Sequence, residues 1–338
     1  MDNSVHTELD LSVDKKKIKC EDVVTCDAYK TYDAQEGNEE RGKEEDEADE
    51  EDEKVRLKTT SDDVYVVQTA RGGVGIMADW DPAMYLANET ERNKPIFDLI
   101  THIPVQNPRR IIDIGCGPGN STASLRKTYK EAEIIGIDNS PGMIAEARKA
   151  DDSITWILRD ANETMDDLGK FDILFSNSTL HWLPRHEALL PRLFNMVAEG
   201  GAAALQMPYY FGTKIYGSLL ALIHSKKWNE LIHLKQPATY HDVGFYYDIL
   251  SECTPAFDIW TTRHIHVLKT KEDILDWYKP TGFKAYLDQL GTDEQKDEFI
   301  ADMRPIVDRL YRAQKDGKYL LRFQRLFIVA HNRVTNKV

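Results

Sequence analysis

The sequence from Met77 onward predicts an α/β fold, in which a seven-stranded, mostly parallel sheet carries helices on both faces. Two observations lead to this prediction. Short apolar runs alternate with amphipathic stretches, which is the pattern of strands joined by helices. The first predicted strand is followed by a glycine-rich turn and a helix, a connection that open parallel sheets place beside a ligand.

The first half of this region contains five predicted strands and three predicted helices. Apolar runs of the kind found in buried parallel strands lie at Arg110–Ile114, Glu133–Asp138, Thr155–Arg159, Phe171–Asn177 and Gly201–Gln206. Amphipathic spacing predicts helices at Ser121–Tyr129, Pro141–Ala150 and Leu189–Asn195, of which the second has proline in its first turn.

The second half is richer in predicted helices. They lie at Thr213–Asn229, Asp242–Ser251, Lys271–Lys279 and Asp293–Gln314, and two further strands are expected at Phe257–Leu268 and Phe323–Ala330. The simplest interpretation is one domain, residues 77–338, with helical insertions at about 209–256 and 270–318. We expect the insertions to cover the active site.

Residues 1–76 differ from the rest in composition. They include the acidic run Glu44–Glu53 and supply −11 of the formal net charge of −14. A segment with so little apolar periodicity cannot offset its ordering entropy by burial, so we predict an acidic, disordered extension. It is either a contact for a protein partner or a solvated extension without a part in the chemistry. The patch Val64–Gln68 is compatible with a strand or with a transient contact.

The composition of the chain also restricts its partners. The remainder carries only about −3, so a nucleic-acid substrate is not expected. A membrane span and a secretory signal are not expected either, which favours a cytoplasmic protein, and we expect a monomer. The cysteines Cys20, Cys26, Cys116 and Cys253 have no metal-ligand spacing, and no metal is predicted.

The glycine turn Gly115–Asn120 (GCGPGN) is the candidate cofactor loop. Its GxGxG spacing differs from the GxGxxG of nicotinamide-binding folds. Asp113 precedes it, where a carboxylate would repel a pyrophosphate but could reach the ammonium of an amino acid. This combination favours S-adenosylmethionine, although a GxGxG sequence alone is also found as a tight turn in ordinary α/β domains.

Further residues at the strand ends complete a cofactor pocket. Asp138 ends the second strand, from which a carboxylate can accept hydrogen bonds from ribose hydroxyls. Asp160 and Ala161 could contact the adenine amino group and Met143 its ring, whereas Asn177 and Ser178 would face the methionine part. The full set of candidates is Asp113, Gly115, Gly117, Gly119, Asn120, Asp138, Asn139, Met143, Asp160, Ala161, Asn177 and Ser178.

From Met77 onward the chain closely resembles the trans-aconitate methyltransferase family, whose members are class I methyltransferases with a Rossmann-like fold. The glycine loop identifies only the superfamily, whereas the other segments together are specific to this family. The resemblance rests on Ala78–Leu86 (ADWDPAMYL), Asp113–Thr122 (DIGCGPGNST), Gly136–Arg148 (GIDNSPGMIAEAR), Phe175–Pro184 (FSNSTLHWLP), Gln206–Pro208 (QMP), Tyr246–Ser251 (YYDILS), Asp276–Gly282 (DWYKPTG) and Arg325–Ala330 (RLFIVA).

The resemblance implies methyl transfer from S-adenosylmethionine to a carboxylate of a small unsaturated tricarboxylic acid, which yields a monomethyl ester and S-adenosylhomocysteine. It places Gly115, Gly117, Asp138 and Ala161 on the cofactor. The chain departs from the family's more polar lining at Tyr209–Tyr210 and also differs at Lys284–Ala285.

Candidate substrate contacts are cations and aromatic side chains. Arg92, Lys284, Arg322 and Arg325 could bind carboxylates, with Arg92 the first choice, and arginine suits bidentate binding. Trp80, Tyr85, Trp182, Tyr209, Tyr247 and Trp277 could wall the pocket, although ordinary core packing explains aromatics equally well.

The acceptor carboxylate should need no general base, because it is already ionised at neutral pH. His181 is placed where it could act as a base, and the alternative is a histidine with a structural role in its loop. Two other functions remain open. One is a methyltransferase of the same fold for another small acid, a hydroxyl or an amine, and the other is a non-catalytic S-adenosylmethionine-binding regulator.

Overall fold

A computed structural model describes residues 58–60, 64–68, 74–78, 89–210, 213–233 and 238–333 of the chain. All of them lie in one compact unit, Glu53–Val338. No helix in these ranges is long and apolar enough to cross a membrane.

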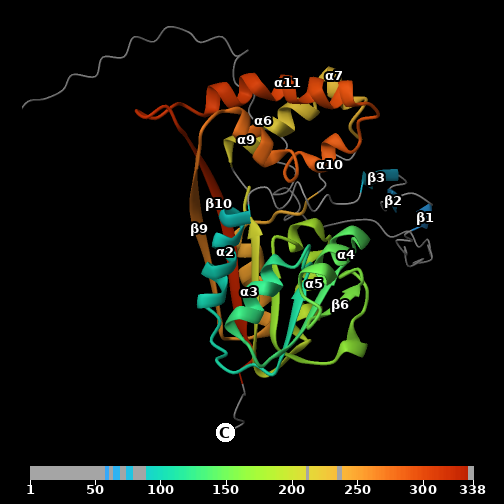
Figure 1. The fold of residues 1–338 in the computed structure, drawn as a ribbon, viewed down its shortest axis with the longest axis vertical. Coiled ribbons are helices and arrows are strands. Elements are labelled where there is room, and N and C mark those ends of the chain that lie inside the picture. The colour runs from blue at the N-terminus through green and yellow to red at the C-terminus, as the bar shows by residue number, and fades with distance from the viewer. Residues whose placement is uncertain are drawn as a thin grey trace, which may run out of the picture. The chain divides into compact units, whose positions relative to one another are not determined.

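Seven strands of the described residues form the main sheet, in the order β6-β5-β4-β7-β8-β10-β9 (Figure 1). Pairs from β6 to β8 are parallel, whereas β10 is antiparallel to both β8 and β9. The predicted seven-stranded, mostly parallel sheet is confirmed. The strands are β4 (Arg110–Ile114), β5 (Glu133–Asp138), β6 (Thr155–Leu158), β7 (Phe171–Asn177), β8 (Val197–Pro208), β9 (Phe257–Leu268) and β10 (Tyr319–His331).

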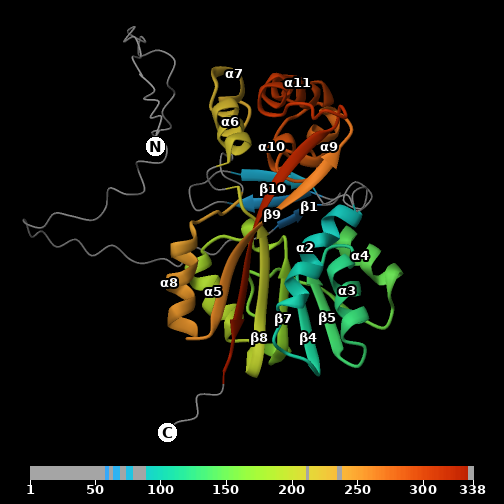
Figure 2. The same cartoon turned by 90° about the vertical axis from the view of Figure 1, so that its left-hand side faces the viewer.

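Helices cover both faces of this sheet, as Figure 2 shows. Alternate residues of a strand point to opposite faces, so Ile111 packs with one layer of helices and Ile112 with the other. This explains why β4 and β5 are apolar throughout rather than alternating. One layer holds α2 (Glu89–Thr101), α3 (Asn120–Thr128) and α4 (Pro141–Ala150), and the other holds α5 (His186–Phe194) and α8 (Val243–Cys253).

A group of helices with its own apolar core stands beyond one end of the sheet (Figure 1). Its largest side chains are aromatic, and they pack onto Leu321 and Phe323 of β10. These helices come from the two predicted insertions. They are α6 (Lys214–Ile223), α7 (Lys226–Asn229), α9 (Glu272–Tyr278), α10 (Lys284–Leu287) and α11 (Asp293–Leu310).

Three short strands form a separate antiparallel sheet: β1 (Lys58–Thr60), β2 (Val64–Gln68) and β3 (Val74–Ala78). They fall largely within residues 1–76, where the sequence left a strand open at Val64–Gln68. The disorder expected for this segment stays a prediction. The runs VYVVQ and VGIMA are rich in β-branched and other apolar residues, which favour strands. Residues 1–57, including the acidic run, lie outside the described ranges.

Candidate active site

The glycine turn between β4 and α3 has the backbone that its sequence predicts. Gly115, Gly117 and Gly119 have φ angles of 70°, 54° and 97°, a region that other residues rarely adopt. A Cβ atom on Gly115 would lie 2.1 Å from Cγ2 of Thr179, so only glycine fits there. A Cβ on Gly117 would meet nothing within 4 Å, so this part of the turn is open to a ligand.

Asp138 connects this turn to the next one. Its Oδ2 atom accepts a hydrogen bond from the Gly117 N–H at 2.9 Å, and its Oδ1 atom accepts one from the Ser140 N–H at 2.9 Å. The carboxylate at the end of β5 therefore holds the glycine turn and the start of α4 together. It stands at the edge of the sheet where the sequence predicts a ribose contact.

Asp113 is fully buried near the carboxyl end of β4. The hydroxyls of Ser121 and Thr122, both in the first turn of α3, donate to its Oδ2 atom at 2.7 Å each. Burial raises the pKa of Asp113 to about 6; the two hydroxyl hydrogen bonds counteract this shift, and the charge of Asp138 adds to it.

Two buried oxygens near the turn have no hydrogen-bond partner within the described residues. They are Oδ1 of Asp113 and Oδ1 of Asn177, which ends β7, the strand next to β4. Buried acceptors are nearly always satisfied in folded proteins. Two such acceptors at neighbouring strand ends suit a donor group from a ligand, such as an ammonium.

The other candidate cofactor residues follow the same edge of the sheet. Gly119 and Asn120 begin α3, and Asp160 Oδ1 accepts from the Asn162 N–H at 2.8 Å. Met143 and Ala161 are buried, whereas Asn139 is exposed. Ser178 has a φ of 59° and donates its N–H to the Gln206 carbonyl at 2.8 Å, which fixes the turn after β7.

A cavity of about 520 Å³ adjoins the carboxyl ends of β7 and β8. Arg325 of β10, 4% exposed, lines it and donates to Ser178 Oγ at 3.2 Å and Gln206 Oε1 at 3.4 Å. The guanidinium carbon also lies 4.7 Å from the centre of the Phe323 ring. A buried cation that lines a cavity suits an anionic substrate.

His181 lines the same cavity, in the short turn Leu180–Trp182 after β7. Burial lowers its pKa to about 3, with smaller contributions from His186 and Arg325. Its ring stacks with Tyr240 at a centroid distance of 5.9 Å. The imidazole is therefore neutral over the physiological range, and so low a pKa is a poor match for a general base.

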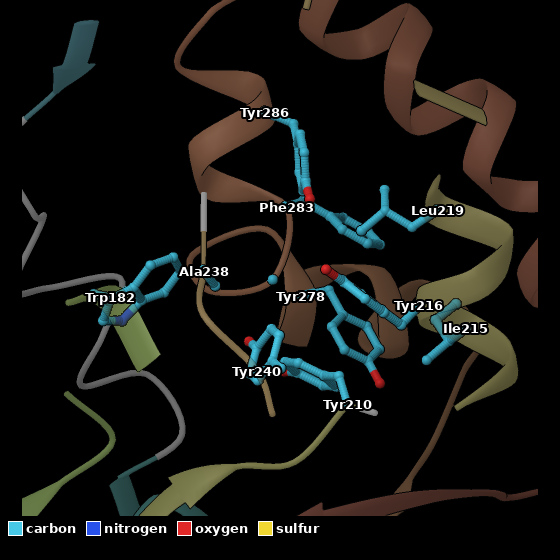
Figure 3. A pocket seen from close by; sticks show the side chains of 11 residues that line it. Trp182, Tyr210, Ile215, Tyr216, Leu219, Ala238, Tyr240, Tyr278, Phe283 and Tyr286 are labelled. Carbon is cyan, nitrogen blue, oxygen red and sulfur yellow. The ribbon is translucent and has the colours of Figure 1, made fainter. Parts of the chain in front are cut away.

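A second cavity, of about 390 Å³, adjoins the first and is lined by aromatic and aliphatic side chains (Figure 3). We call it the tyrosine cavity. Its aromatic lining residues are Trp182, Tyr210, Tyr216, Tyr240, Tyr278, Phe283 and Tyr286.

Known proteins resemble this chain over most of its length. Residues 111–201 match the family described as Methyltransferase domain. The trans-aconitate 2-methyltransferase of Methylobacterium radiotolerans is 36% identical over 75% of this chain and 98% of its own length. Those of Variovorax paradoxus and Escherichia coli O7:K1 are each 35% identical, over 76% and 75% of this chain and 100% and 98% of their own lengths.

The chain belongs to the trans-aconitate 2-methyltransferase family. It is accordingly an S-adenosylmethionine-dependent methyltransferase. In this chain, the candidates for holding the cofactor are the residues of the glycine turn and those at the strand ends beside it.

The structure brings three of the predicted substrate residues into this methyltransferase's cavities. Arg325 and Trp277 line the first cavity, which we call the Arg325 cavity, and Trp182 lines both cavities. Trp80 and Tyr85 lie outside the described residues, and Arg92 is in α2 with a side chain that is not described.

Four predicted substrate residues do not line either cavity. Lys284 forms an ion pair with Asp288 at 2.7 Å, and Arg322 is exposed on the opposite face of β10 from Arg325. Tyr209 packs in the core of the sheet, and Tyr247 is 56% exposed. The pocket position of these residues stays a prediction, because residue type alone does not show which face of an element a side chain occupies.

Sequence reasoning missed Gln206, Phe323 and most of the tyrosine cavity. Phe323 could have been found from Arg325, because residues two apart on a strand share a face. The tyrosines carry no comparable signal, since a buried tyrosine in a helical core has the same sequence pattern as one that lines a cavity.

Proposed function

We propose that the protein transfers a methyl group from S-adenosylmethionine to a carboxylate of trans-aconitate or of a closely similar small polycarboxylic acid. The products are a monomethyl ester and S-adenosylhomocysteine. The names of the relatives, trans-aconitate 2-methyltransferases, support the substrate class. The observation that carries the proposal is the buried Arg325 in a cavity beside the turn that follows β7.

The cofactor would lie along the carboxyl ends of β4, β5 and β7. Asp138 would accept from ribose hydroxyls, and the open face of Gly117 would allow close approach of the ligand. The buried oxygens of Asp113 and Asn177 would accept from the ammonium of the methionine part. When bound, the cofactor supplies an activated methyl group on its sulfonium.

The acceptor needs positioning rather than proton removal. A carboxylate of ordinary pKa, near 4, is ionised at neutral pH and can attack the methyl carbon directly. Arg325 would hold a carboxylate in the cavity, and holding two reactants in line removes a large part of a bimolecular barrier. The neutral His181 would contribute a wall of the cavity rather than a base.

The test is an assay with labelled S-adenosylmethionine and trans-aconitate, with mass identification of the ester. Arg325→Met should lower kcat/KM by about 30-fold or more, mainly through KM, because removal of one member of a buried charge pair leaves the other without a partner. The matched control Arg322→Met, three residues away and exposed, should change kcat/KM less than about twofold.

Melting temperatures of both variants confirm that they are folded. Equal kinetic parameters for the two variants would remove Arg325 from the substrate site. A wild-type protein that methylates no carboxylic acid would reject the proposed reaction.

A further inference from the structure

The tyrosine cavity lies beside the Arg325 cavity. The two share the lining residues Trp182, Tyr210, Tyr240 and Gly282, so they are two adjacent parts of one region. The methyl transfer proposed above needs only the Arg325 cavity and leaves the tyrosine cavity without a role.

The walls of the tyrosine cavity come from separate insertion segments. In Figure 3, α6 contributes Ile215 and Leu219, and α10 contributes Tyr286. Tyr210, which follows β8, lies opposite Tyr286. Tyr240 contacts Tyr210 and Tyr216 edge to face, at centroid distances of 5.5 and 5.6 Å. All residues that line this cavity belong to the described part of the chain, and none of them is Asp, Glu, Lys, Arg or His.

This environment disfavours a charged group. Burial raises the pKa values of Tyr240 and Tyr278 well above the usual range, so the surroundings already resist a phenolate. A carboxylate placed there would lose its hydration in the same way and would meet the electron-rich faces of aromatic rings. Hydrocarbon, by contrast, gains free energy by leaving water.

We propose that the tyrosine cavity binds an uncharged, largely apolar part of the substrate acid while the carboxylate end lies with Arg325. The inference rests on the proposed methylation of a carboxylate in the Arg325 cavity. It extends the substrate class to unsaturated or aromatic acids with an apolar body of several carbon atoms. Acids without such a body occupy the Arg325 cavity alone.

The first test compares two acids that differ only in the body. Crotonate and trans-2-decenoate share the carboxylate and the double bond, and the second has six more methylene groups. Each methylene that leaves water contributes about fourfold in affinity. The wild-type protein should therefore show a kcat/KM for decenoate at least about 100-fold above that for crotonate, with trans-aconitate measured in the same assay.

The second test fills the cavity from a position that the Arg325 cavity does not share. Ala238→Leu adds three carbon atoms inside the tyrosine cavity and should lower the decenoate-to-crotonate ratio at least about tenfold. The matched control is Ala188→Leu, at an exposed position of α5, which should leave the ratio within about twofold.

Binding to the wild-type protein loaded with S-adenosylhomocysteine gives a readout that is independent of turnover. Calorimetry should show tighter binding of decenoate than of crotonate by a similar factor. A wild-type ratio below about threefold in both measurements overturns the inference, while methylation of trans-aconitate in the same assay leaves the proposed function intact.

Discussion

At the scale of single residues, Asp138 combines two tasks in one carboxylate. It fixes the backbone of Gly117 and Ser140, and in the proposed complex it also accepts from the ribose. Asp138→Ala should therefore raise the dissociation constant of S-adenosylhomocysteine about 10- to 100-fold, as hydrogen bonds to charged groups contribute about 1.5–3 kcal/mol each. Isothermal titration calorimetry measures this dissociation constant.

Asp138→Asn is the conservative comparison, because the amide keeps one acceptor oxygen. We expect its dissociation constant to lie between those of the wild type and Asp138→Ala. Identical values for all three proteins would exclude Asp138 from the cofactor site.

The pKa values of Asp113 and His181 predict how the rate of the reaction depends on pH. The pKa of Asp113 is raised to about 6, so below that pH the carboxyl gains a proton and loses its attraction for an ammonium. The pKa of His181 is lowered to about 3, so it contributes no step above pH 5. The kcat/KM for S-adenosylmethionine should be constant above about pH 7 and fall below pH 6.

Asp113→Asn should remove that fall, at a lower kcat/KM throughout. A steep rise between pH 6 and 8 that disappears in His181→Asn would mean that the acceptor must lose a proton. The substrate would then be a hydroxyl or an amine rather than a carboxylate.

The sequence distinguishes the two arginines of β10 better than residue type suggests. Arg322 and Arg325 are three positions apart on a strand, so they must face opposite sides, and near the start of the strand the side of Leu321 and Phe323 is the more apolar one. Applied to the pattern YLLRFQR, this rule selects Arg325 for the buried face. No such rule places Arg92, because an arginine in the first turn of a helix can point in several directions.

At the scale of elements, a buried hydrogen-bonded pair connects α8 to the turn that carries His181. Tyr246 Oη lies 2.9 Å from Nδ1 of His186, whose Nε2 lies 2.9 Å from the Leu180 carbonyl. Tyr246→Phe should lower the free energy of unfolding by about 1–3 kcal/mol, because a buried imidazole nitrogen loses its partner.

Urea unfolding monitored by circular dichroism measures this change. Tyr247→Phe is the matched control, because Tyr247 is next to Tyr246 in the sequence but its side chain is 56% exposed. It should change the free energy of unfolding by less than about 0.5 kcal/mol. Equal effects of the two substitutions would show that the Tyr246 hydroxyl stabilises nothing.

The parallel strands were predictable to the residue in β4, β5 and β7, where a buried strand between turns has a continuous apolar run. The insertions were predictable only in outline. The expected helix Thr213–Asn229 is broken at His224 and Ser225 into α6 and α7, and α10 has four residues, too few for a periodic signal. The start of β10 depends on the pairing of Tyr319 with Leu268, which is distant in sequence, so local sequence does not predict where the strand begins.

At the scale of the whole molecule, chain order separates the two halves of the proposed reaction. The cofactor edge is built from Asp113 to Ser178, whereas the acceptor cavities are closed mainly by residues after Pro208. The cofactor edge is built on a strand–turn–helix connection that is common to many folds, so it could be predicted from its sequence motif. The second depends on how the insertions pack, so the substrate pocket was visible only in the structure.

Residues 1–52 carry 19 acidic and 7 basic side chains, which is −12 of the net −14, and all described residues lie beyond them. About three quarters of this chain matches 98% or more of the length of its relatives, so we expect the reaction not to depend on the acidic segment. Deletion of residues 1–52 should leave the melting temperature within about 2 °C and kcat/KM for trans-aconitate within about twofold, measured at 0.15 M salt, where charges are screened beyond about 8 Å.

A second deletion of residues 1–78 also removes β1, β2 and β3 and tests whether the small sheet contributes. A tenfold loss of kcat/KM in the shorter deletion would contradict the prediction and assign the acidic segment a part in catalysis.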